Sequence, residues 1–179
     1  VAGRTGKGAA LIAAAGFESG MLTAGFQIAG DGAVVKDGSL SLTPSSSLAI
    51  GAPGLPTGGA SLSFELLSGT AVASLRLENG QVLSIDTNGS ILSGTGAVRS
   101  RIDLGTGKRI QYAVKVTENG LELHGANGET IAIPVFPAAD AQWIISAAPE
   151  NQAEITRVLV TAFELLLAKS SGDEAQERP

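Results

Sequence analysis

The sequence predicts an all-β protein, an antiparallel β-sandwich. The first observation is a set of four Asn-Gly pairs, each between short segments of alternating apolar and polar residues: Asn79-Gly80, Asn88-Gly89, Asn119-Gly120 and Asn127-Gly128. Asn and Gly readily adopt the positive φ that both central residues of a type I′ hairpin turn require. The second observation is that about a dozen short candidate strands follow one another at intervals of roughly 8–12 residues, as in sandwiches and barrels.

Composition limits the class of protein. The chain has 179 residues, of which 44% are hydrophobic and 4% aromatic, which predicts one domain with an aliphatic core that needs neither disulfides nor metal. A net charge of −5 disfavours nucleic-acid binding, because that affinity comes mostly from neutralised phosphates. The absence of cysteine excludes a disulfide, a thiolate zinc site and a cysteine nucleophile. No apolar segment approaches the roughly 18–20 residues that span a bilayer.

The ends of the chain differ from its middle. Residues 1–8 are Gly-rich and basic, which predicts a flexible arm, and residues 170–179 are polar and charged, which predicts a disordered tail. Between them we expect a single sandwich domain over residues 9–169. The chain begins with Val1 rather than Met, so we expect an excised fragment or a processed form from which a signal peptide or membrane anchor has been removed.

Strands of the first half are expected where apolar segments lie between turn signals. Ser39–Leu42 alternates as a half-buried strand does. A Pro/Ser/Gly-rich stretch over 44–59 contains Leu48–Ile50, and because proline cannot donate to a ladder, this piece is predicted to be an edge strand followed by a loop. The expected strands before it are Leu11–Phe17, Gly25–Ala29, Ala33–Lys36 and Ser39–Thr43.

The second half continues the series. Its last segment admits two interpretations, since Ile155 and Leu159 fit both a helix face and an alternating strand. β-branched residues dominate Ile155–Thr161 and favour a strand there, while Glu164–Lys169 is left open to a helix. The expected strands are Ser61–Leu67, Ala71–Glu78, Gln81–Asp86, Ser90–Leu92, Ala97–Leu104, Arg109–Thr117, Leu121–His124, Thr130–Val135, Trp143–Ala147 and Ile155–Phe163.

Three segments carry a resemblance to a known superfamily: the opening Gly16-Phe17-Glu18-Ser19-Gly20, the strand Asp37-Gly38-Ser39-Leu40-Ser41-Leu42, and the closing stretch from Ala153 to Val160. In this order the chain resembles the concanavalin A-like lectin/glucanase superfamily, in particular laminin-G-like bacterial modules. The resemblance implies a jelly roll of two large antiparallel sheets with the first and last strands adjacent. It implies no single activity, because the superfamily holds glycosidases, sugar-binding lectins and modules without a known ligand.

Catalytic signals are missing from the sequence. The glycosidase branch places paired carboxylates on one strand, typically Glu-x-Asp-x-Glu, whereas Glu65, Glu78, Asp86 and Glu122 are single acids near strand ends. His124 is out of phase with the neighbouring leucines, which predicts that it faces outward with Glu122 rather than serving a Ser-His-Asp triad. We therefore predict that the chain is not an enzyme. The alternative is a glycoside-active enzyme of the same fold with a dispersed active site.

A group of cations is the main ligand-binding candidate. A hairpin that pairs Arg101 with Gln111 or Ala113 would place four cations on one exposed surface, namely Arg99, Arg101, Arg109 and Lys115. Such a surface suits an anionic polysaccharide, a peptide carboxylate or an acidic partner. The competing interpretation is a solvated face balanced by acids on neighbouring strands. The cations are Arg99, Arg101, Lys108, Arg109 and Lys115.

Two further candidates concern stacking and metal. Trp143 would offer a platform for a sugar ring, although a lone Trp beside Ile144 and Ile145 is more often a core residue. Tyr112 is in phase with buried positions and is expected inside. Asp86 and Asn88 are the first candidates for a calcium site, since carboxylates and carbonyls on loops suit a hard cation. No other cofactor is expected.

Taken together, these features predict a non-catalytic binding or interaction module for carbohydrate or an anionic polymer. Its partners would be a polysaccharide or another protein, with no nucleic acid and no membrane-spanning segment in this fragment. The resemblance and the missing Met place it outside the cytoplasm, in the periplasm, on the cell surface or secreted. The second alternative is a purely structural module of a larger surface or regulatory protein.

Overall fold

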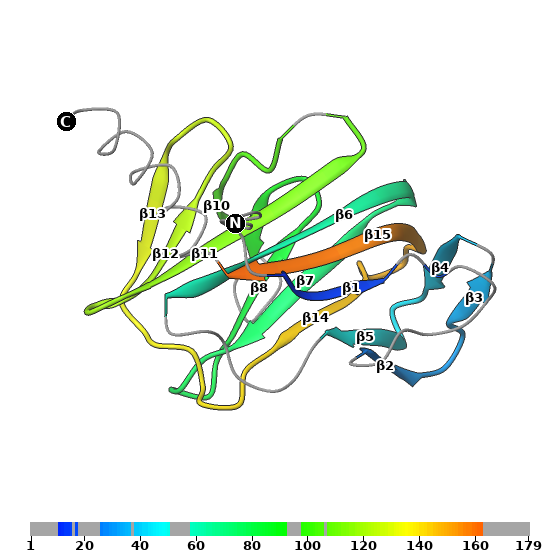
Figure 1. Ribbon diagram of the computed structural model, residues 1–179, viewed down its shortest axis with the longest axis horizontal. Helices are drawn as coiled ribbons and strands as arrows, with labels where there is room; N and C mark the ends of the chain where they lie inside the picture. The colour runs from blue at the N-terminus through cyan, green and yellow to red at the C-terminus, as the bar shows by residue number, and fades with distance from the viewer. Residues whose placement is uncertain are drawn as a thin grey trace, which may run out of the picture.

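The computed structural model describes residues 11–15, 17, 26–36, 38–50, 58–92, 98–105 and 107–162, without the side chains of 11–15, 98 and 99. These residues form β-strands that lie in two layers, with no helix in the described ranges (Figure 1). All strand pairs are antiparallel. The predicted all-β sandwich is therefore confirmed. Within the described residues no helix could cross a membrane.

One layer, here called the β15 sheet, has eight strands. Their order is β13 (Thr130–Ile133), β12 (Gly120–His124), β11 (Arg109–Thr117), β6 (Gly59–Gly69), β15 (Ala153–Ala162), β4 (Ser39–Leu42) and β3 (Val34–Lys36). The eighth strand, β1 (Leu11–Ala15), pairs with the second half of β15, so the first and last strands of the described chain are adjacent, as the resemblance implies.

The other layer, the β14 sheet, has seven strands. Their order is β10 (Val98–Arg101), β9 (Ser90–Leu92), β8 (Val82–Asp86), β7 (Ala71–Arg76), β14 (Trp143–Ala147), β5 (Ser46–Ile50) and β2 (Phe26–Gly30). Strand β5 lies between β14 and β2, so the predicted edge strand at Leu48–Ile50 is wrong. The physical reason is that Pro44 precedes the first residue of the strand, so no proline interrupts its ladder.

All four Asn-Gly pairs join antiparallel neighbours: β7 to β8, β8 to β9, β11 to β12 and β12 to β13. Only the glycine of each pair has positive φ, however, so the turns are not of type I′. In two of them the Asn side chain forms an Asx turn, accepting the N–H two residues further on: Asn79 Oδ1 from Gln81 at 3.0 Å and Asn127 Oδ1 from Glu129 at 3.1 Å. The predicted hairpins are confirmed and the predicted turn type is wrong.

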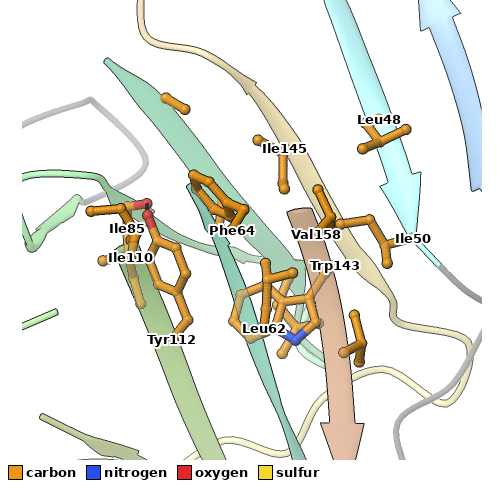
Figure 2. Close-up of a cluster of buried hydrophobic side chains, with 14 of the residues drawn as sticks. Leu48, Ile50, Leu62, Phe64, Ile85, Ile110, Tyr112, Trp143, Ile145 and Val158 are labelled. Carbon is orange, nitrogen blue, oxygen red and sulfur yellow. Dashed lines mark hydrogen bonds between the residues drawn. The ribbon is translucent and has the colours of Figure 1, made fainter. Parts of the chain in front are cut away.

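The core between the sheets is mostly aliphatic, with three aromatic rings at its centre (Figure 2). Tyr112 of β11 lies 6.1 Å from Phe64 and 5.8 Å from Trp143, measured between ring centroids. Its hydroxyl donates to the carbonyl oxygen of Ile85 across the sandwich at 3.2 Å. Because Tyr112 belongs to the β15 sheet and Ile85 to the β14 sheet, this hydrogen bond joins the two layers directly.

The closing segment Ala153–Ala162 is a strand, as the β-branched residues predicted, and pairs with β6 along its length. The residues left open to a helix, 164–169, lie outside the described residues. So do the predicted arm over 1–8 and the predicted tail over 170–179.

Candidate functional site

The outer face of the β14 sheet presents two continuous rows of side chains across its strands. The first row, from direct register partners, is Leu92, Ser84, Ser74, Ile144, Ala49 and Gln27. The second row is Asp86, Val72, Ser146, Ser47 and Ala29. Since strands lie about 4.8 Å apart, the first row extends roughly 24 Å across six strands.

Apart from the amide of Gln27, the side chains of these two rows are small, hydroxylated or aliphatic, and Asp86 is their single charged member. Four serines supply hydroxyl groups, and two of them, Ser74 and Ser84, lie 3.3 Å apart, oxygen to oxygen. Ile144 is 39% exposed at the centre of the first row. A neutral ligand with many hydroxyl groups suits this surface, because it offers hydrogen bonds and an apolar contact without an unpaired charge.

Asp86 stands at one end of the second row, where β8 turns into β9. Its Oδ1 accepts the backbone N–H of Asn88 at 2.9 Å and that of Ser90 at 3.0 Å. The residues described contain no group of three His, Cys, Asp or Glu side chains that could hold a metal ion. The calcium site at Asp86 and Asn88 therefore stays a prediction, and the geometry gives Asp86 a role in closing the turn.

Charged side chains gather instead on the outer face of the β15 sheet. Arg109 lies opposite Glu65, and Lys115 lies opposite Glu122. Nε2 of His124 is 2.8 Å from Oε1 of Glu122, so the outward placement of this histidine is confirmed.

A β-bulge interrupts β15 on this face. Thr156 lies opposite Glu65 and Leu159 opposite Ser63, so two residues of β15 face one residue of β6. Arg157, with φ of 52°, occupies the left-handed region, which costs a non-glycine residue of order 1 kcal/mol. Sequence reasoning missed the bulge, because Val158, Leu159 and Val160 are all apolar and do not show which of them face inward, so only the pairing with β6 reveals the extra residue.

The bulge links two arginines and one carboxylate. Arg109 donates from Nη2 to Ser63 Oγ at 2.8 Å and from Nη1 to the carbonyl oxygen of Arg157 at 3.4 Å. Nη1 of Arg157 lies 3.7 Å from Oε2 of Glu65. The Arg157 side chain is 73% exposed and that of Glu65 28% exposed. We call these four residues, Ser63, Glu65, Arg109 and Arg157, the bulge cluster.

The predicted basic surface does not form. Arg101 belongs to β10 of the β14 sheet, where it pairs with Ser90, whereas Arg109 and Lys115 belong to β11 of the β15 sheet. The predicted hairpin register is therefore wrong. Ile102 and Leu104 are buried, since the connection between β10 and β11 crosses from one layer to the other. Arg99 lies in β10, and its side chain is not among those that the structure describes. Lys108 is exposed just before β11.

Trp143 cannot serve as an exposed platform for a sugar. Its side chain is 1% exposed and packs against Tyr112 in the core. The alternation of β14 places Ile144 outward and Trp143 inward, so this candidate is corrected to a core residue. The serine and alanine positions that do face outward were not recognised from the sequence, although the same alternation in β5, β7 and β8 would have marked them.

No protein-family model matches the chain, and no curated protein matches it either. Solved structures do share its fold. Domain 4 of AbnA, an extracellular GH43 arabinanase from Geobacillus stearothermophilus in complex with arabinotriose, is 17% identical with a TM-score of 0.55, over 88% of this chain and 94% of that one. The β-glucanase of Bacillus licheniformis is 10% identical with a TM-score of 0.51, over 88% and 99%. The fold is a concanavalin A-like jelly roll.

These comparisons contradict the prediction that the chain is not an enzyme, since one of the structures with this fold is a β-glucanase. That prediction used the absence of a carboxylate array on a single strand and of a Ser-His-Asp triad. Neighbouring strands of an antiparallel sheet bring together residues that are far apart in sequence, as the rows on the β14 sheet show. A missing array on one strand is therefore a weak reason to exclude catalysis.

Proposed function

We propose that this chain is a glycoside-active domain that binds a neutral polysaccharide across the two rows on the outer face of the β14 sheet. The observation that carries the proposal is the continuity of these rows over the strands from β9 to β2 with one charged side chain among them. A polysaccharide is a long ligand with repeated hydroxyl groups, and a row of serines with an aliphatic centre matches it in length and polarity.

The comparisons support the class of ligand. Among the structures with this fold, one is a β-glucanase and another was solved in complex with arabinotriose. The charge of the two rows supports a neutral ligand too, because their single charged member is the acid Asp86 and they offer no cation to a polyanion. An exported location belongs to the same proposal, since such a domain meets polysaccharides outside the cytoplasm.

Asp86 is the residue of the two rows that could act on a glycosidic linkage. Hydrolysis of this kind uses two carboxyl groups, about 5–5.5 Å apart in retaining enzymes and about 6.5–9.5 Å apart in inverting ones. Asp86 supplies one of them. The two rows supply no second carboxyl group, so Asp86 would act together with an acid from outside the two rows.

Binding is tested with the full chain, a β-glucan and an arabinan, measured by affinity electrophoresis and by calorimetry with oligosaccharides. Ile144→Arg places a charge at the centre of the first row and is expected to weaken binding roughly thirtyfold or more, the effect of losing a central contact. Val34→Arg is the matched control, since Val34 is also exposed but lies on β3 of the other sheet. Absence of binding to any neutral polysaccharide, or equal losses in both variants, would contradict the proposed surface.

Catalysis is tested by the release of reducing sugars from the same polysaccharides. Asp86→Asn retains an oxygen that accepts the N–H groups of Asn88 and Ser90, so the turn is kept while the acid is removed. If Asp86 acts as general acid or base, release falls at least about a hundredfold while binding is kept. Unchanged release in this variant would remove Asp86 from the reaction.

A further inference from the structure

The bulge cluster is a preorganised group of cations on the face opposite the proposed polysaccharide surface. Arg109 is held at two points, by Ser63 Oγ and by the carbonyl oxygen that the bulge turns outward at Arg157. Each guanidinium has five N–H donors, more than these contacts use. The left-handed backbone at Arg157 is a conformation that glycine would adopt without strain, yet this position carries the most exposed cation of the cluster.

The charges of the cluster do not cancel. The cluster holds two guanidinium groups and one carboxylate, which forms an ion pair with Arg157 and not with Arg109, so its net charge is one positive unit. Glu65 is the less exposed partner and lies between the arginines, opposite Arg109 in the register and 3.7 Å from Arg157. Its position fits a residue that orients Arg157. Lys108 is exposed directly before Arg109 and adds a further positive charge at the same end of β11.

From this geometry we infer that the bulge cluster is a second ligand site, one that binds the carboxylate of an acidic saccharide such as a uronic acid. The inference shares with the proposed function the assumption that the ligand is a carbohydrate, but it uses different residues on the opposite sheet. Arg157 and Arg109 donate to the carboxylate, and the polar groups beside them, Ser63 and Gln111, which face each other across β6 and β11, reach the sugar hydroxyls.

The structure favours a saccharide over an acidic peptide. Peptides commonly bind a sheet by adding a strand to an unpaired edge. Strand β6 is paired on both sides, with β11 and with β15, so the cluster lies in the interior of the sheet and offers no free edge. Recognition there depends on side chains alone, which suits a ring with a carboxylate and hydroxyl groups.

The test measures binding of a trigalacturonate and of its neutral methyl ester to the full chain by calorimetry at low salt, where exposed charges are least screened. The native protein is expected to bind the acid and not the ester. Arg157→Gly removes the guanidinium, while glycine keeps the left-handed backbone, so the fold is retained and the affinity falls roughly tenfold or more. Arg157→Gln, which keeps the native backbone strain, is expected to give the same loss. Glu65→Gln is expected to bind at least as tightly as the native chain.

Arg101→Ala is the matched control for total charge, because Arg101 is an exposed cation on β10 of the other sheet. It is expected to bind the acid like the native protein. Equal binding of the ester, unchanged affinity in both Arg157 variants, or an equal loss in Arg101→Ala would each overturn the site. Tighter binding of a polyglutamate peptide than of trigalacturonate would overturn the choice of a saccharide.

Failure of this site and failure of the proposed function are distinguishable. Arg157→Gly is expected to bind neutral polysaccharide like the native chain, whereas Ile144→Arg is expected to keep its affinity for trigalacturonate. Loss of both ligands in either variant would show that the two faces do not act separately, and would overturn the second site.

Discussion

The two outer faces of the sandwich differ in charge although the same alternation builds both. On the β14 sheet, the two rows contain serine, alanine and aliphatic side chains, with Gln27 and Asp86 as their other polar members. On the β15 sheet, charged residues face one another: on strand β11, Arg109 lies opposite Glu65 and Lys115 lies opposite Glu122. The inner faces are alike, since both supply large apolar side chains to one core. The comparison teaches that inward positions determine the fold, while outward positions are free to specify different ligands.

The sharpest way to test this separation is to change two adjacent residues of β14. Trp143→Ala removes a fully buried side chain and is expected to lower the free energy of unfolding by about 3–5 kcal/mol. Ile144→Ala, one residue later on the outer face, is expected to cost less than about 1 kcal/mol. Urea denaturation measures both. Comparable losses would mean that the outer face of this sheet is part of the core.

The hydrogen bond between the layers gives a smaller effect. Tyr112→Phe removes the contact with Ile85 and is expected to lower the free energy of unfolding by about 1 kcal/mol at neutral pH. Burial, with a contribution from the charge of Asp86, raises the pKa of Tyr112 far above its ordinary value. The unfolded chain therefore loses this proton near pH 10 while the folded protein keeps it, and stability falls as the pH rises beyond about 10.

Tyr112→Phe removes this contribution to the alkaline decline, so the difference in stability between native protein and variant should shrink above about pH 10. Denaturation curves at a series of pH values between neutrality and pH 11 measure it. A difference that stays constant over this range would contradict the assignment of the alkaline decline to Tyr112.

The smallest effect is expected at the margin of the β14 sheet, where Arg76 and Asp140 form an exposed ion pair. The hydrogen bond and charge of Arg76 lower the pKa of Asp140 below its ordinary value of 3.8. Such a group adds stability above its unfolded pKa and loses it as the pH falls, but an exposed pair adds little. Arg76→Ala is expected to return the pKa of Asp140 toward 3.8, as measured by NMR titration. An unchanged pKa would show that the pair does not persist in solution.

Local signals in the sequence were enough for the strands and hairpins but not for their assignment to sheets. The Asn-Gly pairs and the alternation correctly located the turns between β7, β8 and β9 and between β11, β12 and β13. Arg101 and Arg109 are close in sequence, yet they belong to different layers. Strand β10 pairs back with its sequence neighbour β9, whereas β11 pairs with β6, which is far earlier in the chain. No local pattern could predict which of these two kinds of partner a given strand has.

The candidate sites depend on the same non-local information. The two rows on the β14 sheet require β5 and β7 to lie on either side of β14, which is more than fifty residues later in the chain. The bulge cluster requires Arg157 to lie beside Glu65. Outward positions could be read from alternation, as His124 with Glu122 shows. Alternation could not show which outward positions become neighbours, because that depends on which strands pair.

The arrangement of β14 and β15 also has a consequence for biosynthesis. These two strands come last among those described, yet each inserts into the interior of its sheet, between β7 and β5 and between β6 and β4. During translation, four strands lack one partner until residues 143–162 leave the ribosome, and each keeps an edge of unpaired backbone N–H and C=O groups. These strands are β4, β5, β6 and β7. Pairing within both sheets is therefore completed only after residues 143–162 have been synthesised, and the nascent chain is most exposed to self-association just before that point.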